Sequence, residues 1–302
     1  MASEPSSKAR ALGQLFLQRP SEDGSNARNI AWQIDHRLEL VSFWNITSGS
    51  RVLEIGCGQG DCTIVLADAV GEGGHVDAVD PGAPDYGAPY TLYQSQSYIT
   101  SGPLGHRISF YNAHPTEYLS SLPASAQKYD YVVLSHCIWY FSSPAHLSTL
   151  ITAIAPWTQS LCLAEWSLRA SDTRAQPHVL TALLLASAAA KRKVEGDGNI
   201  RTVLSPTQIC SMAQSSSAFK LSAQGTRAVN IGLLDAYWEV SDTLRQREGV
   251  LKALGEEGVS EKELAAMAAM YDAIKAAVGI LGEGVRGVRS MDVWVAKFQR
   301  VG

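Results

Sequence analysis

Five short apolar runs recur along the first half of the chain, and longer segments with the spacing of helices or loops separate them. The runs are RVLEIG, HVDAVD, RISFYNA, YDYVVLSHCIW and SLCLAEWSL. Strands that are buried on both faces read as nearly continuous apolar runs, and crossover-length segments join parallel neighbours. The pattern predicts an α/β fold with a doubly wound, mostly parallel sheet. The later runs FKLSAQGTRAV and SMDVWVAKF would complete seven strands.

The polar and helical segments predict how the rest of the chain is organised. Residues 1–28 are polar and uneven in composition, and we expect a flexible segment or a lid. Four apolar residues then fall on one face of an amphipathic helix that begins near Asn29: Ile30, Ile34, Leu38 and Val41. We expect residues 29–302 to form a single domain, with helical insertions near 172–193 and 233–285. The inserted helices either shape a pocket or only pack and form a homodimer interface.

The composition favours a globular protein that binds a small molecule. Hydrophobic residues make up 46% of the 302 residues, and 25 Lys and Arg against 29 Asp and Glu give a net charge of -4. This charge provides no broad electrostatic footprint for nucleic acid or for an acidic membrane surface. The longest apolar run, residues 180–190, is too short to cross a bilayer, and the N-terminus has no apolar signal core. We therefore expect a cytoplasmic protein, with its five scattered cysteines reduced.

A glycine-rich turn follows the first predicted strand. The sequence Glu54-x-Gly56-x-Gly58-x-Gly60 joins that strand to a predicted helix, DCTIVLADAV. The turn contains no basic residue, and the Glu54 carboxylate would repel a diphosphate. It would favour a ligand with cationic groups, such as the ammonium and sulfonium of S-adenosylmethionine. Asp80 ends the second predicted strand, where an acid can accept hydrogen bonds from both hydroxyls of a ribose.

With these motifs in this order, the chain resembles the class I S-adenosylmethionine-dependent methyltransferases. The resemblance covers roughly residues 30–168 and the last two predicted strands. It implies the Rossmann-like fold of that family and S-adenosylmethionine as the cofactor. The segments CGQGDCTIVLADAVGEGGHVDAVDP and HCIWYFSSP look most like those of small-molecule methyltransferases of fungal secondary metabolism.

The resemblance also implies which residues contact the cofactor. The turn would cradle the methionine part, Asp80 would hold the ribose, and Asn112 would read the adenine amino group. Asn112 departs from the Asp that is common at this position, but its side-chain carbonyl can accept the same hydrogen bond. Cys57 is expected to contribute its backbone amide. The expected cofactor contacts are Glu54, Gly56, Cys57, Gly58, Gly60, Asp80, Pro81, Asn112, Ala113 and Ser135.

His136 is the candidate catalytic residue, because it ends the fourth predicted strand. The carboxyl ends of strands in an open α/β sheet face the ligand crevice, so His136 could take a proton from a hydroxyl acceptor. The alternative is a histidine that supports a loop or the cofactor. Arg28 and Arg37 either pair with the cofactor carboxylate or lie on the surface.

Several aromatic residues are candidates for a wall around a flat or cationic substrate, and a place in the core is the alternative. They follow the fourth and fifth predicted strands or open the second helical insertion: Trp139, Tyr140, Trp166, Tyr237 and Trp238.

The expected function is S-adenosylmethionine-dependent methylation of a small organic molecule at oxygen, nitrogen or carbon by in-line displacement. One alternative is an enzyme that retains the cofactor on the same fold and catalyses a cyclisation or rearrangement. Another is a non-catalytic regulator that binds S-adenosylmethionine. The sequence shows no cluster of carboxylates beside the fourth predicted strand, so no metal site is expected.

Overall fold

A seven-stranded sheet forms the centre of the computed structural model, which describes residues 4–193, 200–215 and 218–301. The strand order is β3-β2-β1-β4-β5-β7-β6, and β7 runs antiparallel to both of its neighbours. The strands are β1 (Arg51–Ile55), β2 (His75–Asp80), β3 (Ile108–Asn112), β4 (Tyr129–Ser135), β5 (Thr158–Trp166), β6 (Phe219–Arg227) and β7 (Val293–Arg300). The predicted doubly wound, mostly parallel sheet is confirmed.

The order of the strands places a crevice at one edge of the sheet. The chain moves outward from β1 to β2 and β3 and then returns to the other side of β1 as β4. At this reversal Ile55 lies beside Val79 on one side and Leu134 on the other. Ligands of open α/β sheets bind outside the carboxyl ends of the strands at such a point. The glycine turn after β1 and His136 after β4 both lie there.

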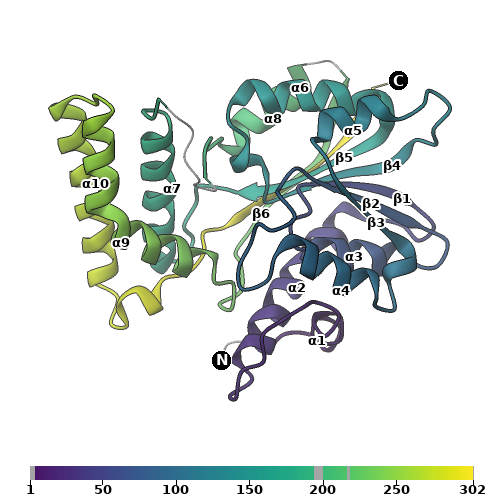
Figure 1. Cartoon of the computed structure of the whole chain (residues 1–302), viewed down its shortest axis with the longest axis horizontal. Coiled ribbons are helices and arrows are strands. Elements are labelled where there is room, and N and C mark those ends of the chain that lie inside the picture. The colour runs from purple at the N-terminus through teal and green to yellow at the C-terminus, as the bar shows by residue number, and fades with distance from the viewer. Residues whose placement is uncertain (1–3, 194–199, 216–217, 302) are drawn as a thin grey trace.

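Helices cover both faces of the sheet (Figure 1). On one face lie α2 (Ser25–Trp44), α3 (Asp61–Val70) and α4 (Leu92–Thr100). On the other lie α5 (Pro115–Ser121), α6 (Pro144–Ile154) and α8 (Pro206–Ser215). The α2 helix begins at Ser25, four residues before the predicted start, and buries Ile34, Leu40 and Trp44 against the sheet and α3.

The N-terminal segment packs on α2. The α1 helix (Ser7–Gly13) begins after Ser6, whose side chain accepts a hydrogen bond from the Ala9 N–H. Ala9 and Leu12 are buried in the main core. Residues 1–3 of the predicted N-terminal segment lie outside the described residues, and its role as a lid stays a prediction.

Three helices form a separate group beyond the end of the sheet (Figure 1). They are α7 (Gln176–Ala189), α9 (Asp235–Glu256) and α10 (Glu261–Gly279). Apolar residues between them form a second core, which includes Leu184, Val240, Tyr271 and Ile274. Because α9 begins beside the carboxyl ends of the strands, the group reaches the crevice with its first turn.

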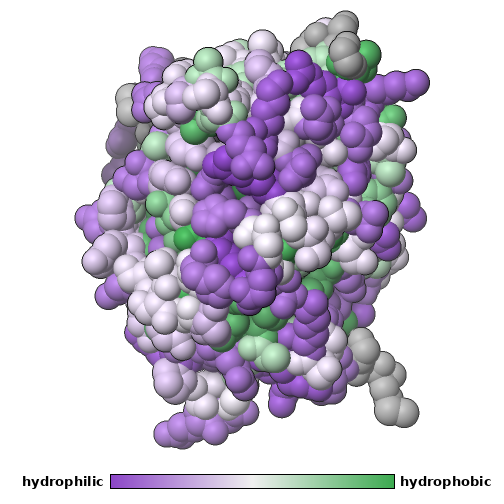
Figure 2. Space-filling view, turned by 90° about the vertical axis from the view of Figure 1, so that its right-hand side faces the viewer, coloured by the Kyte–Doolittle hydropathy of each residue, from purple (hydrophilic) through white to green (hydrophobic). Residues whose placement is uncertain are grey.

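The opposite side of the molecule is mostly hydrophilic. Figure 2 shows the side that lies away from the three-helix group, where green residues are scattered among purple and white ones. Among the residues that the structure describes, no helix is both long and apolar enough to cross a membrane.

Candidate active site

The turn after β1 requires glycine. Gly56, Gly58 and Gly60 have φ angles of 75°, 51° and 95°, in the left-handed region that glycine adopts without a steric penalty. A Cβ atom on Gly56 would lie 2.6 Å from that of Cys137. One on Gly60 would lie 2.6 Å from Ile99 Cδ1, whereas nothing lies within 4 Å of one on Gly58. The turn is therefore tightly packed at both ends and open above Gly58, where a ligand can approach the backbone.

The Glu54 carboxyl group lies inside the protein beneath this turn. Glu54 is 2% exposed, and the Thr63 hydroxyl of α3 donates a hydrogen bond to it at 2.5 Å. Burial raises the pKa of Glu54 to about 7, although the Thr63 hydrogen bond opposes this. The sequence predicts contact with the cationic methionine part, but the structure turns the carboxyl group toward α3. Glu54 thus ties β1 to α3 and supports the turn.

Asp80 holds the turn with both of its carboxylate oxygens. Its Oδ2 accepts a hydrogen bond from the Gly58 N–H and its Oδ1 accepts one from the Gly82 N–H, each at 2.8 Å. The Asn112 amide donates to the backbone oxygens of Asp80 and Gly82 at 3.1 and 2.5 Å. These contacts use both amide hydrogens of the exposed Asn112, so its side-chain oxygen is left to accept from a ligand. The structure thus brings together three of the predicted cofactor contacts.

The other predicted contacts near β2 and β3 differ in exposure. Pro81 is exposed, and the half-buried Ala113 donates its N–H to the Asp80 carbonyl at 3.1 Å. Cys57 is buried, and its N–H points to the Val79 carbonyl at 3.4 Å. Burial also raises the pKa of the Cys57 thiol well above its usual range. The Cys57 amide therefore serves the junction between the turn and β2.

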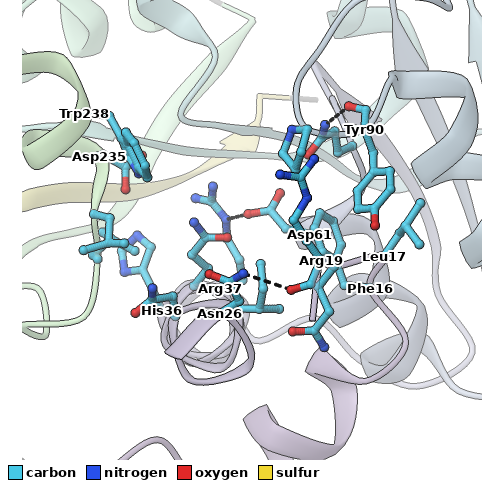
Figure 3. A pocket seen from close by; sticks show the side chains of 18 of the residues that line it. Phe16, Leu17, Arg19, Asn26, His36, Arg37, Asp61, Tyr90, Asp235 and Trp238 are labelled. Carbon is cyan, nitrogen blue, oxygen red and sulfur yellow. Dashed lines mark hydrogen bonds and ion pairs between the residues drawn. The ribbon is translucent and has the colours of Figure 1, made fainter. Parts of the chain in front are cut away.

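A cavity of about 770 Å³ lies beside the turn at the carboxyl ends of the strands (Figure 3). Residues 16–37, the turn itself, the loop after β2 and the first turn of α9 contribute to its walls. The side chains that determine its chemistry are His36, Arg37, His136, Trp166, Asp235 and Trp238. Figure 3 shows Asp235, Trp238 and His36 on one side of the cavity and Phe16, Leu17 and Tyr90 on the other.

The buried His36 and the half-buried His136 meet in the wall of the cavity. The Nε2 atoms of His36 and His136 lie 2.9 Å apart. Burial lowers the pKa of both histidines well below the ordinary value, and the nearby positive charge of Arg37 lowers it further. Both rings are therefore neutral at pH 7. One ring carries its proton on Nε2 and donates a hydrogen bond to the unprotonated Nε2 of the other.

Glu165 lies behind His136 at the end of β5. Its Oε1 is 3.7 Å from Nδ1 of His136, and that nitrogen is buried without a hydrogen-bond partner among the residues that the structure describes. The other Glu165 oxygen accepts hydrogen bonds from the N–H groups of Ile138 and Trp139 at 3.0 and 3.2 Å. Burial raises the pKa of Glu165 to about 7, and its backbone hydrogen bonds partly offset this. Glu165 thereby fixes the loop that carries His136, which has a positive φ of 53°.

Arg37 is a half-buried cation in the wall of the cavity. Its Nε donates to Asp61 Oδ2 at 2.8 Å and its Nη1 donates to Ser135 Oγ at 3.2 Å. This contact places the predicted Ser135 behind the wall of the cavity. Within the described part of the chain no hydrogen bond engages Nη2 of Arg37, so this nitrogen can bind an anionic group. Arg28, the other predicted partner of the cofactor carboxylate, is exposed and does not line this cavity.

The predicted aromatic residues separate into core and cavity positions. Trp139 is 1% exposed and its indole N–H donates to the Leu204 carbonyl at 3.0 Å, so it packs in the core and does not form the expected wall. Trp166 is buried but lines the cavity, and its ring centroid lies 4.5 Å from that of His136. Tyr140 is half-exposed and lies outside the lining residues.

The aromatic pair at the start of α9 divides in the same way. Trp238 is 58% exposed and lines the cavity, whereas Tyr237 does not line it. The Tyr237 ring packs edge-on against Trp238, with the two centroids 5.2 Å apart. Tyr237 therefore supports the Trp238 ring from behind.

His36 and Asp235 are site residues that the sequence analysis did not identify. His36 occupies the polar sequence IDHRLE of α2, and its partner His136 is 100 residues away. No local pattern marks such a contact. Asp235 stands two residues before Tyr237 and three before Trp238, so its place at the head of a helix with two candidate aromatic residues is the signal that the sequence offers.

These features fit S-adenosylmethionine. The backbone is open above Gly58, Asp80 presents a carboxylate, and Asn112 keeps a free acceptor oxygen. Across the described ranges, no group of three or more His, Cys, Asp or Glu residues is arranged to hold a metal ion.

Comparisons with known proteins agree with this geometry. The model of the family described as "Methyltransferase domain" matches residues 23–211, more than half of the chain. Two relatives from Diaporthe leptostromiformis, methyltransferase phomM and methyltransferase phomM', are each 29% identical over 327 residues. The alignments cover 96% of this chain and 81% of each relative. The crystal structure of a cyclopropane-fatty-acyl-phospholipid synthase-like protein from Lactobacillus casei has a TM-score of 0.80 and 28% identity, covering 97% of this chain and 98% of that one.

Proposed function

This chain belongs to the methyltransferase domain family, and from that premise we propose that the cavity beside the glycine turn holds the acceptor of the methyl group. The protein is an S-adenosylmethionine-dependent methyltransferase. When bound, S-adenosylmethionine supplies the methyl group from its sulfonium. One observation carries the proposal: the cavity borders the turn through Gln59 and Asp61, at the point where the strand order reverses.

The polar groups around the turn support a position for each part of the cofactor. Asp80 retains lone pairs for the ribose hydroxyls after accepting its two backbone N–H groups. The side-chain oxygen of Asn112 accepts from the adenine amino group. Arg37 offers Nη2 to the carboxylate of the methionine part, while Asp61 and Ser135 hold the guanidinium in place.

The acceptor is proposed to be a small organic molecule. A cavity of about 770 Å³ has the size of a small-molecule site. The two relatives that are named methyltransferases come from a fungus, which is in keeping with the expected role in secondary metabolism. The cytoplasmic location, the homodimer and the absence of a nucleic-acid partner stay predictions.

The chain has to position the acceptor in line with the methyl group and the sulfur, and it has to exclude water. Neither nitrogen of His136 is placed to take a proton from an acceptor in the cavity, because Nε2 bonds to His36 and the unpartnered Nδ1 is buried beside Glu165. His136 therefore acts by positioning. Its ring holds Trp166 and α2 at the fixed spacing that the cofactor and the acceptor require.

The variant His136→Asn tests this positioning role, since Asn tolerates a positive φ. Cofactor affinity and methylation rate should fall together, and the wild-type rate at saturation should show no limb near the ordinary histidine pKa of about 6.5. His114→Asn is a matched control, because His114 is exposed at the start of α5. Unchanged affinity with a rate lowered by about 100-fold to 10,000-fold would instead show that His136 is a general base.

A further inference from the structure

Asp235 lies at the first position of α9 and lines the cavity from there (Figure 3). We propose that the methyl acceptor is an amine, which the Asp235 carboxylate binds as its ammonium form beside the Trp238 ring. This inference rests on the proposed function, because it names the substrate class for the same cavity.

The charges that line the cavity leave Asp235 without a partner. Among the described residues, no ion pair or side-chain hydrogen bond joins Asp235 to another residue. The half-buried Arg37 is engaged by Asp61 at 2.8 Å and by Ser135 at 3.2 Å. Arg19 also lines the cavity, but it is exposed to solvent. Of the two carboxylates that line the cavity, Asp61 is therefore paired, whereas Asp235 has no direct ion pair and feels the charge of Arg37 only beyond ion-pair distance.

The surroundings of the Asp235 carboxylate favour the binding of a cationic ligand. Burial raises the pKa of Asp235 and the neighbouring Glu239 carboxylate raises it further, while Arg37 and His178 partly offset this rise. Glu239 accepts a hydrogen bond from Nε2 of His178 at 2.9 Å. Nδ1 of His178 accepts from the Met291 N–H at 3.0 Å, so Nε2 is the nitrogen that donates to Glu239. A partly buried carboxylate is costly unless it is paired, and a cationic ligand would pair it.

Trp238 supplies the second contact for an ammonium group. Its ring is 58% exposed and lies on the same side of the cavity as Asp235 (Figure 3). An indole ring attracts a cation through its face more strongly than the other aromatic side chains do. Tyr237 packs edge-on against this ring and fixes its orientation. A carboxylate and an indole ring three residues apart on one helix suit an organic ammonium, and they disfavour an acceptor that carries a carboxylate or a phosphate.

The bound ammonium must lose one proton before its nitrogen can react. The Asp235 carboxylate takes this proton, which leaves a neutral amine and a carboxylic acid. The nitrogen lone pair then forms a bond to the methyl carbon, the carbon–sulfur bond breaks, and its electron pair stays on sulfur. The product is an N-methylammonium ion, and Asp235 releases its proton to solvent.

Calorimetry with matched amines and alcohols tests the proposal directly. The probes are benzylamine, 2-phenylethylamine and tryptamine with their alcohols, benzyl alcohol, 2-phenylethanol and tryptophol, each titrated into the complex with S-adenosylhomocysteine. At least one amine should bind about 10-fold to 100-fold more tightly than its alcohol, the effect of a hydrogen bond to a charged group. Asp235→Asn should remove this preference and leave the affinity for S-adenosylhomocysteine unchanged.

Two further variants separate this effect from damage to the fold. Trp238→Leu should weaken amine binding and spare the alcohols. Asp242→Asn is the matched control, because Asp242 lies on the same helix and pairs with Arg245 at the surface. Equal binding of amines and alcohols, no binding of any probe, or a preference that survives in Asp235→Asn would overturn the proposal. Failure of the wild type to bind S-adenosylhomocysteine would instead contradict the proposed function.

Discussion

Replacing Asp80 by Ala would remove the acceptor on which both the turn and the proposed ribose site depend. The two carboxylate oxygens of Asp80 receive the N–H groups of Gly58 and Gly82, each at 2.8 Å. A hydrogen bond to a charged group contributes about 1.5–3 kcal/mol. The ribose hydroxyls of the cofactor and the backbone of the turn would bind the same carboxylate, so the free energies that are lost at the two contacts are not additive. We expect binding to weaken by about 1.5–3 kcal/mol, which corresponds to about a 10-fold to 150-fold increase in Kd.

Calorimetric titration with S-adenosylhomocysteine measures this loss, and a thermal melt of each variant shows whether the turn still folds. Asp80→Asn keeps one acceptor oxygen and should lose less affinity than Asp80→Ala. Asp85→Ala is the control, because Asp85 is exposed in the loop that follows β2. An unchanged Kd in a well-folded Asp80→Ala variant would refute the assignment of the ribose to Asp80.

Two other perturbations test the turn and the histidine pair. Gly58→Val fills the open space above the turn, so S-adenosylhomocysteine should bind at least about 100-fold more weakly. Gly49→Val is the control and should not weaken binding, because Gly49 also has a positive φ, of 82°, but lies outside the cavity. Burial lowers the pKa of His36 and His136, so the unfolded chain takes up their protons first as pH falls. The wild type should have a larger free energy of unfolding than the double variant His36→Gln/His136→Asn at neutral pH. This difference should shrink below about pH 6.5, by up to about 2.7 kcal/mol per pH unit for the two histidines. Chemical denaturation measures both free energies of unfolding, and a difference between them that stays constant from about pH 7.5 to 5 would contradict the lowered pKa values.

The sheet was predictable because each of its strands is a local apolar run. The runs around Val52, Val132 and Leu161 are buried on both faces, and such strands have a distinctive sequence. The place of β7 between β5 and β6 was harder to predict from the sequence. It depends on how the three-helix group returns the chain to the sheet, which involves packing between residues far apart in the sequence.

The cofactor side of the site was more predictable than the acceptor side. Gly58 and Asp80 are defined by a positive φ and by the end of a strand, and both are local properties. Glu54 shows the limit of this reasoning, because its position before the turn is local but the direction of its carboxyl group depends on Thr63 in α3. The contact between His36 and His136 depends on the docking of α2 against the end of β4.

Transfer of a labelled methyl group is the most direct test of the central claim. The enzyme is incubated with S-adenosylmethionine that carries an isotopic label in its methyl group and with a panel of small amines, alcohols and carbon acids. We predict that label appears in an organic product together with one equivalent of S-adenosylhomocysteine, and that both are lost in Gly58→Val. Consumption of an acceptor without incorporation of label, or binding of S-adenosylmethionine without any transfer across the panel, would contradict the claim that this cavity is the site of methyl transfer.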